Sequence, residues 1–121
     1  MNLAFSRRLA LAIGVCLPLA ETLRLWGSGG SLALGLDHFI AGAFLLVGVW
    51  MSRRYDSSGS RYLVAAWAFT CGIGYTSLVS QLAGMNGLGA APSSQIWVAG
   101  TVGVGFLICC LGLAASLKAT N

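Results

Sequence analysis

Residues 96–117 read IWVAGTVGVGFLICCLGLAASL, and this run contains no Asp, Glu, Lys, Arg or His. Residues 62–83, YLVAAWAFTCGIGYTSLVSQLA, are free of the same residues. A helix needs roughly 20 apolar residues to cross the hydrocarbon core of a bilayer. A strand of a membrane barrel alternates apolar and polar residues over about ten positions, whereas these runs are continuously apolar. Both stretches therefore predict transmembrane helices.

Two similar runs precede them, so the fold class is predicted to be all-α, an integral membrane four-helix transmembrane bundle. The 121 residues are expected to form a single transmembrane domain, 1–121, whose spans are approximately 9–26, 32–51, 62–83 and 96–117. The break GSGGS at 27–31 is too short to let the first two helices separate. Consecutive helices are therefore expected to be antiparallel neighbours.

The composition excludes other classes of protein. Charged residues make up 8 % of the chain, against about 25 % in typical soluble domains. The mean hydropathy of +0.82 also argues against a disordered chain, because disordered chains are polar and rich in charge. The net charge of +4 does not indicate nucleic-acid binding in so apolar a chain; it reports membrane orientation instead.

Cysteine usage does not indicate a disulfide framework or a zinc site, because no CxxC pair occurs and every cysteine lies inside an apolar run. We expect small buried apolar side chains at Cys16, Cys71, Cys109 and Cys110.

Orientation follows from the distribution of basic residues. Six of the seven Lys and Arg fall on the side that holds both ends of the chain, and Arg24 is the exception. Basic residues are retained in the cytoplasm, so both termini are predicted to be cytoplasmic, an N-in/C-in arrangement. The short loops favour the bacterial inner (cytoplasmic) membrane. The six residues are Arg7, Arg8, Arg53, Arg54, Arg61 and Lys118.

Small residues recur at helical spacing and predict close packing of helices. One interpretation places them at helix crossings inside the bundle. The other makes them a surface for oligomerisation or for docking on a larger partner. The stripes are Gly35, His38 and Gly42; Ala65, Ala68, Gly72 and Thr76; and Ala99, Gly103, Cys110 and Ala114. Pro18 is expected to bend the first helix and to free the carbonyl near Gly14.

An intramembrane ionisable cluster is the strongest candidate for function, because charges within a span are costly. Glu21 lies roughly 9 Å, and Asp37 and His38 roughly 8–9 Å, below the outer ends of their helices. Arg24 shares a helix face with Glu21 and is placed to pair with Glu21, Asp37 or both. Polar residues of the outer half are expected to support the cluster: Tyr75, Thr76, Ser80, Gln81 and Thr101.

Three interpretations of the cluster remain open. It is an ion-paired clasp that fixes the register of the first two helices, a proton or cation site, or a metal site. Glu21, Asp37 and His38 are weak metal candidates, since Arg24 beside them opposes a cation. No metal is predicted, no cofactor is predicted, and no catalytic residue is assigned.

The length and the four spans are similar to those of the small multidrug resistance transporters, which carry an acidic residue in the first helix. Glu21 is the matching position. It lies nearer the outer end than the middle of its helix, however, and the strong charge bias contradicts insertion in two orientations. The chain is therefore not assigned to that family.

The leading hypothesis is an accessory or structural membrane subunit, or an oligomeric component of a membrane complex. Its expected partners are the lipid bilayer and other membrane protein chains, either copies of itself or a larger complex. The alternative is a small oligomeric transporter or channel that handles protons or a cation through Glu21, Asp37 and His38. Enzymatic activity is not favoured, because no arrangement of nucleophile, histidine and acid is evident.

Overall fold

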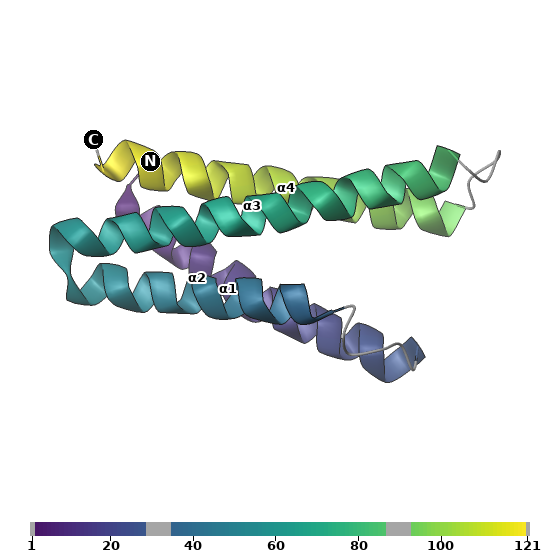
Figure 1. Cartoon of the computed structure of the whole chain (residues 1–121), viewed down its shortest axis with the longest axis horizontal. Coiled ribbons are helices and arrows are strands. Elements are labelled where there is room, and N and C mark those ends of the chain that lie inside the picture. Colours follow the sequence, from purple (N-terminus) through teal and green to yellow (C-terminus); the bar gives the residue numbers. More distant parts are fainter. Residues whose placement is uncertain (1, 29–34, 87–92, 121) are drawn as a thin grey trace.

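The computed structural model describes residues 2–28, 35–86 and 93–120, and these residues form four helices (Figure 1). The helices are α1 (Leu3–Ser28), α2 (Leu36–Arg54), α3 (Asp56–Asn86) and α4 (Ser93–Thr120). All four are long and apolar enough to cross a membrane. The predicted all-α class and the four membrane-compatible helices are confirmed.

Three of the helices begin earlier in the chain than the predicted spans. α1 starts at Leu3, α3 at Asp56 and α4 at Ser93. The polar residues just before each apolar run, Ser and Arg among them, are compatible with a helix, so each helix extends beyond its apolar run. Only Tyr55 separates α2 from α3. The predicted start of the second span, at residue 32, lies outside the described residues.

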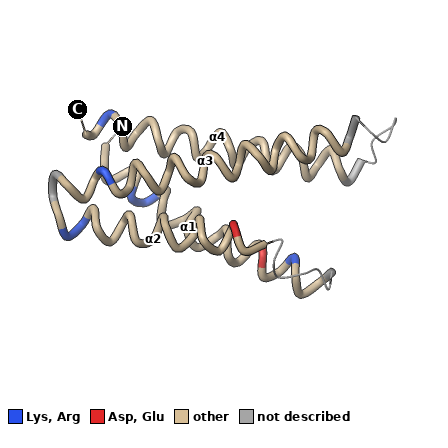
Figure 2. The backbone as a smooth tube through the Cα atoms, in the orientation of Figure 1, with Lys and Arg blue, Asp and Glu red and all other residues tan. Residues whose placement is uncertain are grey.

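Both termini and the α2–α3 junction lie at one end of the molecule, which we call the terminal end (Figure 1). Figure 2 shows most Lys and Arg gathered at that end, whereas the Asp and Glu residues drawn lie in the opposite half. α1 packs mainly on α2, α2 on α3, and α3 on α4, while α1 and α3 scarcely touch. The α1–α2 and α3–α4 pairs diverge away from the terminal end (Figure 1).

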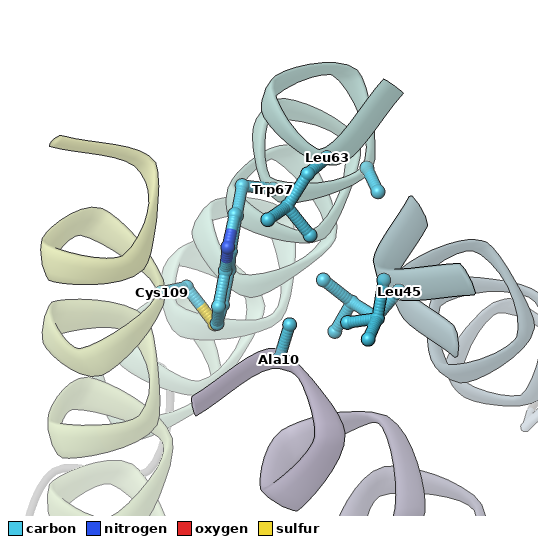
Figure 3. Close-up of a cluster of buried hydrophobic side chains, with 7 residues drawn as sticks. Ala10, Leu45, Leu63, Trp67 and Cys109 are labelled. Carbon is cyan, nitrogen blue, oxygen red and sulfur yellow. The ribbon is translucent and has the colours of Figure 1, made fainter. Parts of the chain in front are cut away.

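The hydrophobic core is small and is contributed by all four helices. Figure 3 shows Ala10, Leu45, Leu63, Trp67 and Cys109 directed into a common interior. Trp67 is fully buried. It is the largest side chain in this core, so the packing around its indole ring largely determines how α3 and α4 fit together.

Glycines bring the helix backbones close together at two crossings. A Cβ added at Gly42 would lie 2.6 Å from Pro18 Cγ and 2.8 Å from the Gly14 carbonyl oxygen, so α1 and α2 meet there. The Gly14 carbonyl, which the sequence predicted to be freed by Pro18, thus faces the glycine of the neighbouring helix. At Gly112 of α4, an added Cβ would lie 2.5 Å from Trp67 Cε2.

The small-residue stripes therefore do not all mark helix crossings. Gly35 and Gly42 are buried, as a crossing requires. The interpretation is wrong for α3, whose stripe is exposed along its whole length, and an added Cβ at Gly72 would meet nothing within 4 Å. On α4 burial is mixed, with Ala99 buried and Ala114 exposed. The exposed α3 stripe consists of Ala65, Ala68, Gly72 and Thr76.

A buried network of neutral polar groups joins three helices near the terminal end. Trp67 Nε1 donates a hydrogen bond to Ser6 Oγ at 3.0 Å. Ser6 Oγ lies 2.6 Å from Ser116 Oγ and 3.2 Å from the Gly112 carbonyl oxygen. Both hydroxyls of this buried network therefore have hydrogen-bond partners within the protein.

Arg7, one of the basic residues used to predict orientation, also joins two helices. Its Nε donates to Ser52 Oγ at 3.0 Å, and its Nη2 donates to the Ser52 carbonyl oxygen. Ser52 lies in the last turn of α2, where carbonyl groups lack helical partners and a cation is favourable. Arg7 thus links α1 to the carboxyl end of α2.

The expectation that all four cysteines are buried is wrong for Cys16, which is exposed. Cys109 is buried, and Cys71 and Cys110 are half-buried. All four are free thiols.

Candidate functional site

Glu21 is the centre of the ionisable cluster formed by Glu21, Arg24, Asp37 and His38. It is 6 % exposed and lies in the last third of α1. The i, i+3 spacing brings Arg24 onto the same face, where its Nε donates to Glu21 Oε1 at 3.1 Å and its Nη2 approaches the same oxygen at 2.5 Å. The carboxylate is thus neutralised by a guanidinium that is itself 59 % exposed.

The side chain of Glu21 also abuts the beginning of α2. A Cβ added at Gly35, which precedes the first residue of α2, would overlap the Glu21 carboxylate. Only glycine leaves room for this contact. The amino end of a helix carries unsatisfied N–H groups and a partial positive charge, so a carboxylate there is favourable. Glu21 therefore connects α1 to α2 electrostatically as well as sterically.

Asp37 and His38 complete the cluster from the first turn of α2. His38 Nδ1 lies 3.0 Å from Asp37 Oδ1 and 4.0 Å from Glu21 Oε2. The Asp37 carboxylate also accepts a hydrogen bond from the His38 backbone N–H at 3.0 Å. The structure thus brings together the four residues of the predicted cluster, with His38 between the two carboxylates.

The five residues expected to support the cluster lie on α3 and α4. Thr76 donates to the Ile73 carbonyl and Thr101 donates to the Trp97 carbonyl, so both hydroxyls are held by their own helices. The Tyr75 ring lies 6.4 Å from that of Phe106. Ser80 is exposed and Gln81 is half-buried. None of these contacts joins a supporting side chain to the cluster.

A cavity of about 530 Å³ lies between α1, α3 and α4 on the side away from the terminal end. Glu21, Arg24 and His38 line it, together with apolar side chains such as Leu17, Val98 and Phe106. Its volume is within the range of about 300–1,000 Å³ that is usual for ligand pockets. The ionisable cluster therefore borders an open space as well as joining two helices.

Sequence reasoning missed this cavity. It lies where the helix pairs diverge and where Gly105 leaves part of the α4 wall without a side chain, since an added Cβ there would meet nothing within 4 Å. This glycine was visible in the sequence, but its direction around the helix was not. Thr70 and Ser77 were missed for the same reason.

Among the described residues, no group of three or more His, Cys, Asp or Glu side chains could hold a metal ion. Glu21, Asp37 and His38, the weak metal candidates, therefore do not form such a group in this arrangement. Comparisons of the chain with models of known protein families, with curated proteins and with solved structures found no match.

Proposed function

We propose that this chain is an accessory membrane subunit that acts by packing against other membrane chains, copies of itself or components of a larger complex. In this proposal the helices are antiparallel neighbours in the bacterial inner membrane, with both termini cytoplasmic. The single observation that carries the proposal is the exposed α3 stripe of Ala65, Ala68, Gly72 and Thr76. Stripes of small residues allow close helix approach in lipid, and this chain's own helices leave this one uncovered.

The geometry of the ionisable cluster supports a clasp rather than a reaction centre. Glu21 is neutralised by Arg24 and is in contact with the start of α2. Buried ion pairs contribute to structural specificity more dependably than to stability. The cluster holds α1 against α2 and so presents a rigid bundle to a partner.

The experiment measures crosslinking to a partner and compares Leu substitutions at two glycines, Gly72 and Gly100, whose added Cβ atoms would meet nothing within 4 Å. A benzophenone photoprobe that replaces the exposed aromatic side chain of Tyr75, beside the stripe, should form a discrete crosslinked adduct in native membranes, identified by mass spectrometry. Gly72→Leu should abolish that adduct, because the larger side chain separates the two helices. Gly100→Leu is the matched control, since an added Cβ at Gly100 on α4 also meets nothing within 4 Å.

An adduct that survives Gly72→Leu, or the absence of any protein adduct at Tyr75, contradicts the proposal. A monodisperse single chain that catalyses flux on its own contradicts it as well.

The alternative function is a small oligomeric transporter or channel for protons or a cation. One observation favours it: Glu21 and His38 both line the cavity. This alternative expects Glu21→Gln or Asp37→Asn to abolish flux in liposomes while the protein still folds. If the wild-type protein catalyses no flux, or if both variants retain it, the clasp explanation is the better one.

A further inference from the structure

The walls of the cavity change from apolar at the bottom to charged at the rim. Ile13, Thr70 and Cys109 line the bottom, nearest the hydrophobic core. Arg24, His38 and Trp97 line the rim, near the end of α1, the start of α2 and the start of α4. The bottom and the rim therefore suit different chemical groups.

The two threonines of the wall already donate their hydroxyl protons to carbonyl groups of their own helices. Thr70 donates to the Ala66 carbonyl at 2.8 Å, and Thr101 donates to the Trp97 carbonyl at 2.9 Å. A buried water molecule needs about three hydrogen-bonding partners, and an ion needs more. The lower part of the cavity therefore suits a hydrocarbon chain better than water or an ion.

The position of the cavity makes it accessible to lipid. It lies between the α1–α2 and α3–α4 pairs, which diverge there (Figure 1), and it is open at the surface rather than enclosed. The medium around such a protein is hydrocarbon, with no water at this depth. A phospholipid chain can thus enter sideways while its headgroup stays at the level of the rim.

The charge at the rim selects the headgroup. The charges of Glu21 and Arg24, which line the cavity, cancel. Asp37, whose Oδ1 lies 3.0 Å from Nδ1 of the lining residue His38, adds one negative charge beside the rim, so the cluster carries a net charge of −1 with His38 neutral. Asp37 is about half exposed, and its carboxylate is accessible to a headgroup. Excess negative charge favours an amine over an anionic headgroup.

We propose that the cavity binds one phospholipid whose headgroup carries an amine, with an acyl chain between α1, α3 and α4 and the amine beside Asp37 and Glu21. The lipid belongs to the leaflet at the end of the bundle opposite the terminal end. This inference depends neither on the α3 stripe nor on which side of the membrane is cytoplasmic.

The first experiment fills the cavity. The purified full-length protein is delipidated, supplied with phosphatidylethanolamine or phosphatidylglycerol, and examined by native mass spectrometry. The wild-type protein should retain one phosphatidylethanolamine and much less phosphatidylglycerol. Gly105→Leu should lose the retained lipid, because an added Cβ at Gly105 meets nothing within 4 Å and the side chain occupies the cavity. Gly100→Leu, on the same helix but outside the cavity, should retain it.

Two outcomes overturn the inference: retention of phosphatidylethanolamine by Gly105→Leu as strongly as by Gly100→Leu, or no lipid retained by the wild-type protein. Circular dichroism and thermal unfolding of both variants show whether the helices remain intact.

The second experiment tests the headgroup without disturbing the Glu21–Arg24 ion pair. Asp37→Asn removes an accessible negative charge and keeps the shape of the side chain. The ratio of bound phosphatidylethanolamine to phosphatidylglycerol should fall toward one, while the total lipid bound stays the same. An unchanged ratio overturns the assignment of the amine, even where the cavity binds a chain.

Discussion

The two side chains of the Glu21–Arg24 ion pair are buried to different extents. Removing one partner should therefore affect stability differently from removing the other. The Glu21 side chain is 7 % exposed, whereas the Arg24 side chain is 59 % exposed. An exposed guanidinium can be solvated without its partner. A buried carboxylate cannot, and an unpaired buried charge is strongly unfavourable.

We therefore expect Arg24→Gln to destabilise the protein more than Glu21→Gln does. Arg24→Gln leaves a buried carboxylate without its guanidinium, at a cost of about 2 kcal/mol or more. Glu21→Gln removes the buried charge and should cost less than about 1 kcal/mol. Thermal unfolding in mild detergent measures both.

The double variant Glu21→Gln/Arg24→Gln is the control. It should be more stable than Arg24→Gln alone, because the buried charge has been removed. If Glu21→Gln and Arg24→Gln lost the same amount of stability, the burial of the Glu21 carboxylate would not determine the energetics of the ion pair.

At the scale of single helices, the apolar runs predicted which segments are helical but not which face of each helix is buried. The α3 stripe was visible as Ala65, Ala68, Gly72 and Thr76, yet it faces outward. The crossing that α4 does use, at Gly112 beneath Trp67, was not identified from the sequence. All four helices are apolar around most of their circumference, so periodicity does not distinguish a lipid-facing side from a protein-facing side.

Gly112→Ala tests this crossing. The added Cβ would overlap the indole ring of Trp67, which is fully buried and hydrogen-bonded to Ser6, so the ring has little freedom to move. Overpacking of this kind costs about 1–3 kcal/mol, and the unfolding temperature should fall.

Gly105→Ala on the same helix is the matched control. Its added Cβ meets nothing within 4 Å, so the gain in helix propensity, about 0.5–1 kcal/mol, should leave stability unchanged or slightly higher. If Gly112→Ala were as stable as Gly105→Ala, the α3–α4 contact would not depend on this close approach.

The proximity of the ionisable residues was predictable because helix rise converts position in the chain into distance along a helix. This arithmetic placed Glu21, Asp37 and His38 at one level, and the structure brings them together. The contact between Glu21 and Gly35, and the Ser6–Trp67–Ser116 network, depend on rotation about the helix axes and were not predictable. Neutral serines in an apolar run give no distinctive signal until their partners are known.

For the molecule as a whole, packing and charge are both distributed unevenly along the bundle. The core around Trp67 and the Arg7–Ser52 link lie toward the terminal end, together with most of the basic residues (Figure 2). The cavity, Glu21 and Asp37 lie toward the other end. One half is thus packed against itself, while the other is open to lipid or to a partner.

The charge distribution makes a prediction about insertion that is independent of the packing. Because basic residues are retained in the cytoplasm, the terminal end should face inward, and a reporter fused after Asn121 should be cytoplasmic. We expect a fluorescent protein at this position to be bright in bacterial cells and alkaline phosphatase to be inactive. The same reporters fused after Trp26, following the first span only, should show the reverse pattern. Active phosphatase at Asn121 would place the basic residues outside and reverse the proposed orientation. A phospholipid in the cavity would then belong to the cytoplasmic leaflet.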